Sequence, residues 1–198
     1  MHVIIIGDIV DSRHLEAGIW LPVLEEVLQK YSGTFDIFRG DSFQVDISPA
    51  KCFEFVFYLK ARIRSLGGLD VRMGIGVGEV DYIGKEIKSS NGEAFVLAGQ
   101  AFDSLKKELV TIQSPWTAYD VPINIMLDLA TELADKWTVN MAESIAAALA
   151  HPQASQQELA TLLNRKYQSQ VSTELNKGHY ALISKVIDYS TQELINRC

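Results

Sequence analysis

Two short segments in which apolar and polar residues alternate flank a glycine turn near the start of the chain. Between Phe35 and Ile47, apolar side chains recur at every second position on either side of Gly40. A period of two residues is typical of β-strands, and the central glycine, which tolerates positive φ, predicts a β-hairpin. A continuous apolar run within residues 1–8 and a run of small and apolar residues at 71–77 predict two further strands.

The segments between these strands carry apolar residues at intervals of three and four positions, which is the pattern of amphipathic helices. Helices are predicted at 19–31, 49–66 and 92–107, and an edge strand at 109–113. Pro49 suits the first position of the second helix, and Gly67 suits its end. The polar loop at 81–90 carries Lys85 and Lys88, which are interpreted as solvated.

The predicted order of elements, β-α-β-β-α-β, is that of a ferredoxin-like unit. We therefore predict an α+β protein whose first domain, residues 1–114, has this fold. The topology brings the end of the first strand, Asp8, close to Asp41 at the hairpin turn. Two adjacent carboxylates repel unless a cation lies between them, and oxygen ligands at strand ends suit Mg²⁺ or Mn²⁺. The alternative left open is that Asp8 merely follows a strand and Gly40-Asp41 merely makes a turn.

After a boundary at 114–119 the pattern becomes entirely helical, and a second, all-α domain is predicted at 120–198. Its helices are expected at 120–137, 138–150, 155–164, 169–177 and 180–195. Asp120 is expected to cap the first of them, with Pro122 in its first turn. Ser155 and Glu158 have the spacing of a capping box, and Asn164 permits a tight turn.

A short helix, a turn and a helix with a polar face match the helix-turn-helix pattern. Val171 and Leu175 are expected to pack inward on Leu159, Leu162 and Leu163. The residues expected to contact DNA are Arg165 and Lys166 through phosphates, and Gln168, Ser169, Gln170, Ser172 and Thr173 through base edges. Four Lys or Arg side chains against two Glu leave residues 155–185 a charge of +2. Because this charge is small, a plain helical hairpin used for assembly stays an alternative.

The composition narrows the class of protein. The net charge of −7 gives no global attraction to nucleic acid or to an anionic membrane. Cys52 and Cys198 have no metal-type spacing, so reduced thiols and a cytoplasmic location are expected. The four histidines share no metal-ligand spacing either. The N-terminal apolar run is too short to span a membrane, so no membrane partner is expected.

Three stretches together resemble the SatD family, which is itself similar to the palm of class III nucleotide cyclases: 5–13, 39–44 and 72–78. The resemblance, which includes the helix at 92–101, covers about the first 110 residues, and the C-terminal helices resemble the helix-turn-helix end of SatD-type proteins. It implies a metal site, for Mg²⁺ or Mn²⁺, formed by Asp8, Asp41 and the Ile9 carbonyl. It also implies that Asp11, Ser12 and Arg13 hold the phosphates of a nucleotide, and that the protein is a homodimer.

The chain also departs from the cyclase pattern. Where cyclases carry an Asn and an Arg on one helix, this chain has Val96 and Gln100. Neither can orient a ribose and stabilise phosphoryl charge, so cyclase activity is not expected and no catalytic residue is assigned. Three hypotheses follow: a regulator that binds a nucleotide and DNA, a metal-dependent phosphoryl-transfer or nucleotide-processing enzyme, and a module for assembly.

Overall fold

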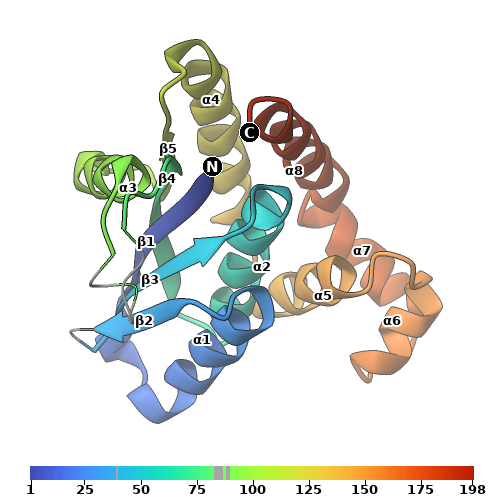
Figure 1. Cartoon of the computed structure of the whole chain (residues 1–198). Coiled ribbons are helices and arrows are strands. Elements are labelled where there is room, and N and C mark those ends of the chain that lie inside the picture. The colour runs from blue at the N-terminus through green and yellow to red at the C-terminus, as the bar shows by residue number, and fades with distance from the viewer. Residues whose placement is uncertain (39, 83–86, 88–89) are drawn as a thin grey trace.

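The computed structural model describes residues 1–38, 40–82, 87 and 90–198, and Arg39, Lys85 and Lys88 lie outside them. The described residues form an α+β structure with a five-stranded mixed sheet and eight α-helices (Figure 1). The strands are β1 (His2–Val10), β2 (Phe35–Phe38), β3 (Ser42–Ile47), β4 (Asp70–Gly78) and β5 (Val110–Gln113). The helices are α1 (Ala17–Tyr31), α2 (Cys52–Arg64), α3 (Glu93–Ser104), α4 (Thr117–Ala134), α5 (Val139–Ala150), α6 (Gln156–Leu162), α7 (Gln168–Lys177) and α8 (Tyr180–Ile195).

The strands lie in the order β2-β3-β1-β4-β5. β1 pairs antiparallel with both β3 and β4, β2 pairs antiparallel with β3, and β5 runs parallel to β4. The β2–β3 hairpin and the edge position of β5 are therefore as predicted. β1 ends two residues later than expected, so Asp8 lies within the strand instead of at its end.

The two faces of the sheet are covered differently. α1 and α2 cover one face, whereas α3 lies on the other (Figure 1). α3 comes close to β4 because Gly74 and Gly76 present no side chain there. A Cβ on Gly76 would overlap the backbone of Ala94 and Ala98, and one on Gly74 would overlap the backbone of Phe102. The small residues that the sequence shows in this strand thus make room for a helix.

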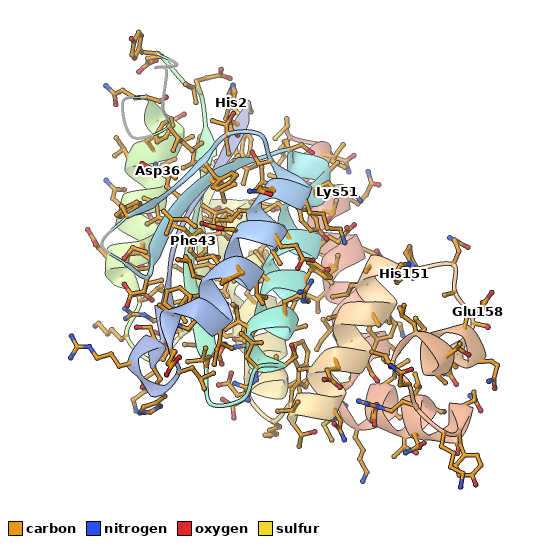
Figure 2. All side chains as sticks on the ribbon, turned by 90° about the horizontal axis from the view of Figure 1, so that it is seen from below. His2, Asp36, Phe43, Lys51, His151 and Glu158 are labelled. Atoms are coloured by element: carbon orange, nitrogen blue, oxygen red, sulfur yellow. The ribbon has the colours of Figure 1, made fainter. Side chains whose placement is uncertain are left out.

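The C-terminal helices share their core with the sheet. Tyr119 and Leu127 of α4, Ile145 of α5 and Ile183 of α8 belong to the same continuous hydrophobic cluster as Val45 of β3. Figure 2 shows the breadth of this assembly, with Asp36 on the sheet side and Glu158 at the far helical end. No helix in the described ranges is long and apolar enough to cross a membrane.

A buried ionic network joins α2 to the start of β4 and the end of α4. The Lys60 side chain is fully buried and donates to both Asp70 oxygens, at 2.8 and 3.0 Å, and to Asp135 at 3.0 Å. Arg64 donates to Asp70 at 2.5 Å and to the Asp135 carbonyl at 2.7 Å. Two cations and two carboxylates balance one another in this network, which makes the burial of Lys60 tolerable.

The start of α4 differs from the sequence prediction. The helix begins at Thr117, three residues before Asp120. Asp120 does not cap it, because its carboxylate accepts hydrogen bonds from the Ser114 backbone N–H at 3.0 Å and from the Ser114 hydroxyl at 2.6 Å. Desolvation raises the pKa of Asp120 above its ordinary value. Asp120 was predicted to cap α4, but in the structure it joins α4 to Ser114, the residue after β5.

Candidate functional site

A pocket of about 580 Å³ opens beside the end of β1 and the β2–β3 turn. It is lined by every residue predicted to bind metal or phosphate, Asp8, Ile9, Asp11, Ser12, Arg13 and Asp41, and by Val10, His14, Arg72, Lys106 and Leu109. These residues come from β1, the 3₁₀ turn η1 (Ser12–His14), the hairpin turn, β4 and the segment between α3 and β5. The sheet topology therefore brings together side chains that are far apart in the sequence.

Asp8 forms an ion pair with Arg72 of the neighbouring strand. The two residues are directly opposite in the β1–β4 register, so their side chains leave the same face of the sheet. Arg72 Nε donates to Asp8 Oδ1 at 2.9 Å, and Arg72 Nη2 donates to Asp8 Oδ2. The side chains are 19% and 39% exposed. This hydrogen bonding raises the pKa of Arg72, burial opposes the rise, and the negative charges of Asp8 and Asp41 add to it.

Asp41 is held from the other side of the pocket. Gly40 has φ +91°, as the predicted turn requires, and the Asp41 carbonyl accepts from the Ile9 backbone N–H at 3.1 Å. The Asp41 carboxylate accepts from the Ser12 hydroxyl at 2.7 Å. Asp11 has φ 59°, a left-handed conformation that is uncommon for a residue other than glycine. The hairpin turn and the 11–14 turn thus fix each other.

The positive charge beside Asp8 is a side chain of the protein itself. Arg72 forms an ion pair with Asp8 and also interacts with the negative charge of Asp41. The sequence indicates this role of Arg72 only indirectly. Arg72 precedes Gly74 and Gly76 at a spacing of two, so all three lie on one face of β4. Its pairing with Asp8 depends on the register, which no local pattern specifies.

The donor set suits a hard cation only in part. Carboxylate oxygens of Asp8 and Asp41 are of the type that Mg²⁺ and Mn²⁺ prefer. Ile9 is 3% exposed, and its backbone carbonyl is the only oxygen that it has for a metal ion. Within the described ranges, no group of three or more His, Cys, Asp or Glu side chains is arranged to hold a metal ion. Asp8 would have to leave Arg72 before it could bind a metal with Asp41.

A second pocket continues from the first. It has a volume of about 570 Å³ and shares Val10, Asp11 and Leu109 with the first pocket. Arg64 and Asp70 of the buried network also line it. Val96 and Gln100, which stand at the positions of the cyclase Asn and Arg, are exposed on α3 and are not among the residues that line either pocket.

The α6–α7 segment has the helix, turn and helix that were predicted. Ser155 and Glu158 form the capping box, and Asn164 has φ 52° in the turn. Val171 and Leu175 of α7 are buried. Leu159 and Leu163 also belong to the core or pack against it, but the prediction for Leu162 is wrong, because it is 55% exposed.

The residues expected to contact DNA differ in availability. Most are exposed or half-exposed, namely Lys166, Gln168, Ser169, Gln170, Ser172 and Thr173. Some also serve α7 itself: Gln170 accepts from the Tyr167 backbone N–H at 3.0 Å, and Gln168 bonds with Gln156 of α6. Gln170 thus caps the start of α7, and Gln168 joins α7 to α6.

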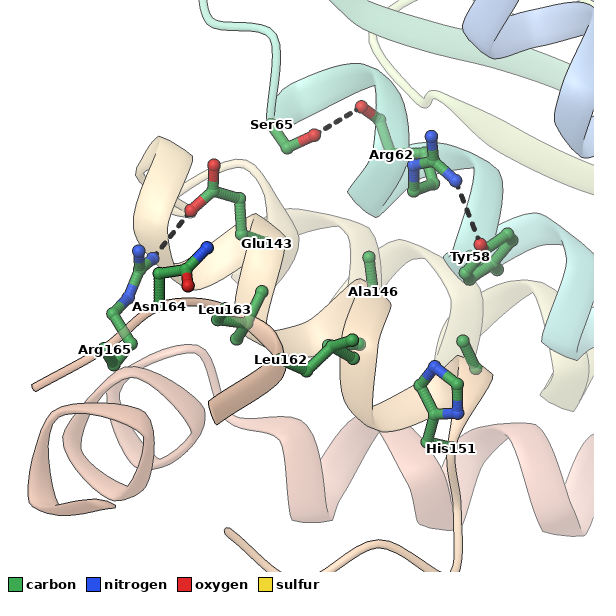
Figure 3. Close-up of a pocket in the computed structure, with 12 residues that line it drawn as sticks. Tyr58, Arg62, Ser65, Glu143, Ala146, His151, Leu162, Leu163, Asn164 and Arg165 are labelled. Carbon is green, nitrogen blue, oxygen red and sulfur yellow. Dashed lines mark hydrogen bonds and ion pairs between the residues drawn. The ribbon is translucent and has the colours of Figure 1, made fainter. Parts of the chain in front are cut away.

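Arg165 is engaged within the protein. Its side chain is 16% exposed and forms an ion pair with Glu143 of α5, at 2.6 Å (Figure 3). It forms a second ion pair with Glu174 of α7, at 3.3 Å. Ser144 also donates to Glu174, at 2.5 Å. Arg165 therefore joins the turn to α5 and α7 and is not free to contact a phosphate in this arrangement. A pocket of about 340 Å³ lies beside it, between α2, α5 and the α6–α7 turn.

Comparison of the chain with protein-family models and with curated proteins found no match. The assignment of function therefore depends on the pocket and on the α6–α7 segment.

Proposed function

We propose that this protein is a cytoplasmic regulator that binds a nucleotide together with Mg²⁺ or Mn²⁺ and contacts DNA through α6 and α7. The observation that carries the nucleotide part is the convergence of Asp8, Ile9, Asp41 and the 11–13 turn on one pocket. The order β2-β3-β1-β4, with its antiparallel pairs, supports the ferredoxin-like palm that the SatD resemblance implies.

The charges of the pocket favour a metal–nucleotide complex over either component alone. Its described lining carries three carboxylates, from Asp8, Asp11 and Asp41, and three cations, from Arg13, Arg72 and Lys106. A lone polyphosphate would meet the carboxylates, and a lone metal ion would meet the cations. A complex of both places positive charge beside the carboxylates and negative charge beside the cations. Oxygen sites that share a metal with substrate phosphates are typical of Mg²⁺.

Calorimetry tests the nucleotide proposal. ATP and GTP are titrated with and without Mn²⁺ into the wild type, Asp41→Asn and Asp103→Asn. Asn keeps an oxygen that can accept from Ser12, so the turn is expected to survive the change at Asp41. Asp103 is an exposed residue of α3 outside the pocket, so its variant controls for the lost charge. Nucleotide binding that needs Mn²⁺ and is weakened only in Asp41→Asn supports the proposal. Equal binding by all three proteins overturns it.

The DNA proposal depends on the exposed side of α7 and on the turn before it. Lys166 and Lys177 are exposed there, whereas Arg165 is held by two glutamates. Because few phosphates can be neutralised per subunit, binding is expected to be weak and to fall steeply with salt. A dimer would offset this by binding two half-sites.

A selection of genomic fragments at low salt tests this second part. The wild type is compared with Lys166→Ala/Lys177→Ala and with Lys51→Ala/Lys136→Ala, which removes the same charge elsewhere. Enrichment by the wild type and the control, but not by the α7 variant, supports the proposal. If the wild type enriches no fragment, the helices serve assembly. The same preparations, incubated with ATP or GTP, reveal any turnover and so test the enzyme alternative.

A further inference from the structure

α4 exposes a row of large aliphatic side chains to solvent. Val121, Ile125 and Leu129 are 56%, 57% and 65% exposed and follow one another at intervals of four residues. This spacing places them on one stripe of the helix surface. Pro122 is exposed beside them and Met126 is half-exposed. Single exposed apolar residues are ordinary, but a contiguous row marks an interaction surface.

The opposite side of the same helix is already used. Tyr119, Ile123 and Leu127 are at most 2% exposed and belong to the hydrophobic core. On that side α4 packs on β5 and α8. A helix that is apolar on both faces is typical of an element buried on both faces. Within the described residues, the outer face of α4 is therefore apolar but exposed, as is typical of a face that packs on another surface.

We propose that a second copy of this chain covers this stripe, with the two α4 helices antiparallel about a two-fold axis at Ile125. The pattern is self-complementary about that residue, because Val121 and Leu129 lie four positions on either side of it. A two-fold axis there places Ile125 against itself and Val121 against Leu129 of the second copy. Such an isologous arrangement is the commonest in protein dimers.

The charges on α4 select the antiparallel orientation. The helix contains no Lys or Arg, and the exposed Asp128 and Glu132 lie in its C-terminal half. The carboxylate of Asp120, in the first turn, is held by Ser114 within the same chain. A parallel pair would bring Asp128 and Glu132 close to their own copies, which is unfavourable. In the antiparallel pair Glu132 approaches the N-terminal turn of the other helix near Ala118, where the helix dipole favours negative charge. The charges therefore favour an antiparallel pair of α4 helices over a parallel pair.

The interface of one helix pair is small. Stable dimers usually bury about 800 Å² on each partner, and two helices alone fall at or below that value. We therefore expect a dissociation constant on the order of micromolar. This inference does not depend on nucleotide or DNA binding.

Analytical ultracentrifugation over a range of concentrations tests the association. The wild type is expected to sediment as a dimer at about 100 μM and to dissociate on dilution, whereas Ile125→Asp is expected to stay a monomer. Ile19→Asp is the control, because Ile19 of α1 is 48% exposed and lies outside the stripe. Circular dichroism of each variant shows whether the fold is kept. A wild type that is monomeric at 100 μM, or a dimer that Ile125→Asp leaves intact, overturns the proposal.

Disulfide crosslinking tests the orientation in a Cys198→Ser background, in which the buried Cys52 is the only other thiol. Ile125→Cys is expected to form a disulfide-linked dimer by itself. Val121→Cys and Leu129→Cys are expected to crosslink only when the two variants are mixed. Efficient crosslinking of Val121→Cys with itself would show a parallel pair and contradict the antiparallel arrangement.

Discussion

If the pocket is the metal–nucleotide site proposed above, replacing Arg72 by Gln is expected to change the affinities for metal and for nucleotide in opposite directions. In the wild type, Arg72 holds Asp8 through two hydrogen bonds. The variant frees this carboxylate for a metal ion and removes a positive charge that would repel the ion. It also removes a cation that would contact a phosphate. Metal alone should therefore bind more tightly to the variant than to the wild type. Adding nucleotide should then raise the affinity for metal less in the variant than in the wild type.

The magnitudes are moderate because the pair is partly exposed. An ion pair of this kind contributes about 1 kcal/mol to folding at most, so the metal-free variant should lose roughly that amount. Removing one positive charge near a divalent ion changes its binding by about 1–2 kcal/mol in a solvated pocket, or roughly tenfold in affinity. At a Mn²⁺ concentration of about 100 times the variant's dissociation constant, Mn²⁺ would stabilise the variant by about 2.7 kcal/mol and the wild type by about 1.4 kcal/mol.

Thermal unfolding with and without Mn²⁺ measures this difference. For a chain of this length, it corresponds to roughly 3–5 °C of extra gain in Tm for the variant. The matched control is Arg62→Gln, because Arg62 also donates two hydrogen bonds to a carboxylate, that of Glu26, at 2.8 and 3.0 Å. Its Tm gain should equal that of the wild type. If Arg72→Gln gains no more than the wild type, Asp8 is not a metal ligand and the reasoning fails.

Three further predictions concern the frame around the pocket. Asn124→Ala should cost about 1–3 kcal/mol in urea unfolding, because the Asn124 amide accepts from Ile112 N–H at 2.8 Å and donates to its carbonyl at 2.9 Å; a cost close to zero would contradict this role. Lys60→Met should cost about 3 kcal/mol, since it breaks a buried network, and a cost below about 1 kcal/mol would contradict that role. In the native protein a thiol reagent should modify only Cys198, because Cys52 is buried and desolvation raises its pKa; modification of both thiols before unfolding would be inconsistent with this.

Local patterns sufficed to predict most of the elements. The alternation around Gly40 specifies the hairpin, because a two-residue period and a positive φ leave few other conformations. Gly67 follows the end of α2, and Pro152 separates α5 from α6, for equally local reasons. The capping box of Ser155 and Glu158 fixes the start of α6 to the residue. In each case the residues that carry the pattern lie within a few positions of the feature that they predict.

Features that depend on distant partners could not be predicted in the same way. Arg165 has the position and charge of a phosphate contact, and only the packing of α5 against the turn reveals that Glu143 holds it. Asp is a residue type that often caps helices, but the Asp120 carboxylate accepts a hydrogen bond from Ser114 instead. Leu162 follows the helical period of the core, yet it lines the open pocket between α6, α5 and α2 and stays 55% exposed. The contacts of these side chains depend on tertiary structure, which local sequence propensity does not specify.

Under the proposed function, the ion pair between Asp8 and Arg72 would couple the binding of metal to that of nucleotide. When metal and phosphate arrive together, the phosphate can replace Asp8 as the anionic partner of Arg72, and the metal can replace Arg72 as the cationic partner of Asp8. Neither exchange is favourable alone, because metal without phosphate leaves Arg72 unpaired and phosphate without metal leaves Asp8 unpaired. Binding of the two is therefore coupled, and each should raise the affinity for the other by the same factor. If the proposed function holds, such a pocket would bind the metal–nucleotide complex more tightly than it binds either component alone.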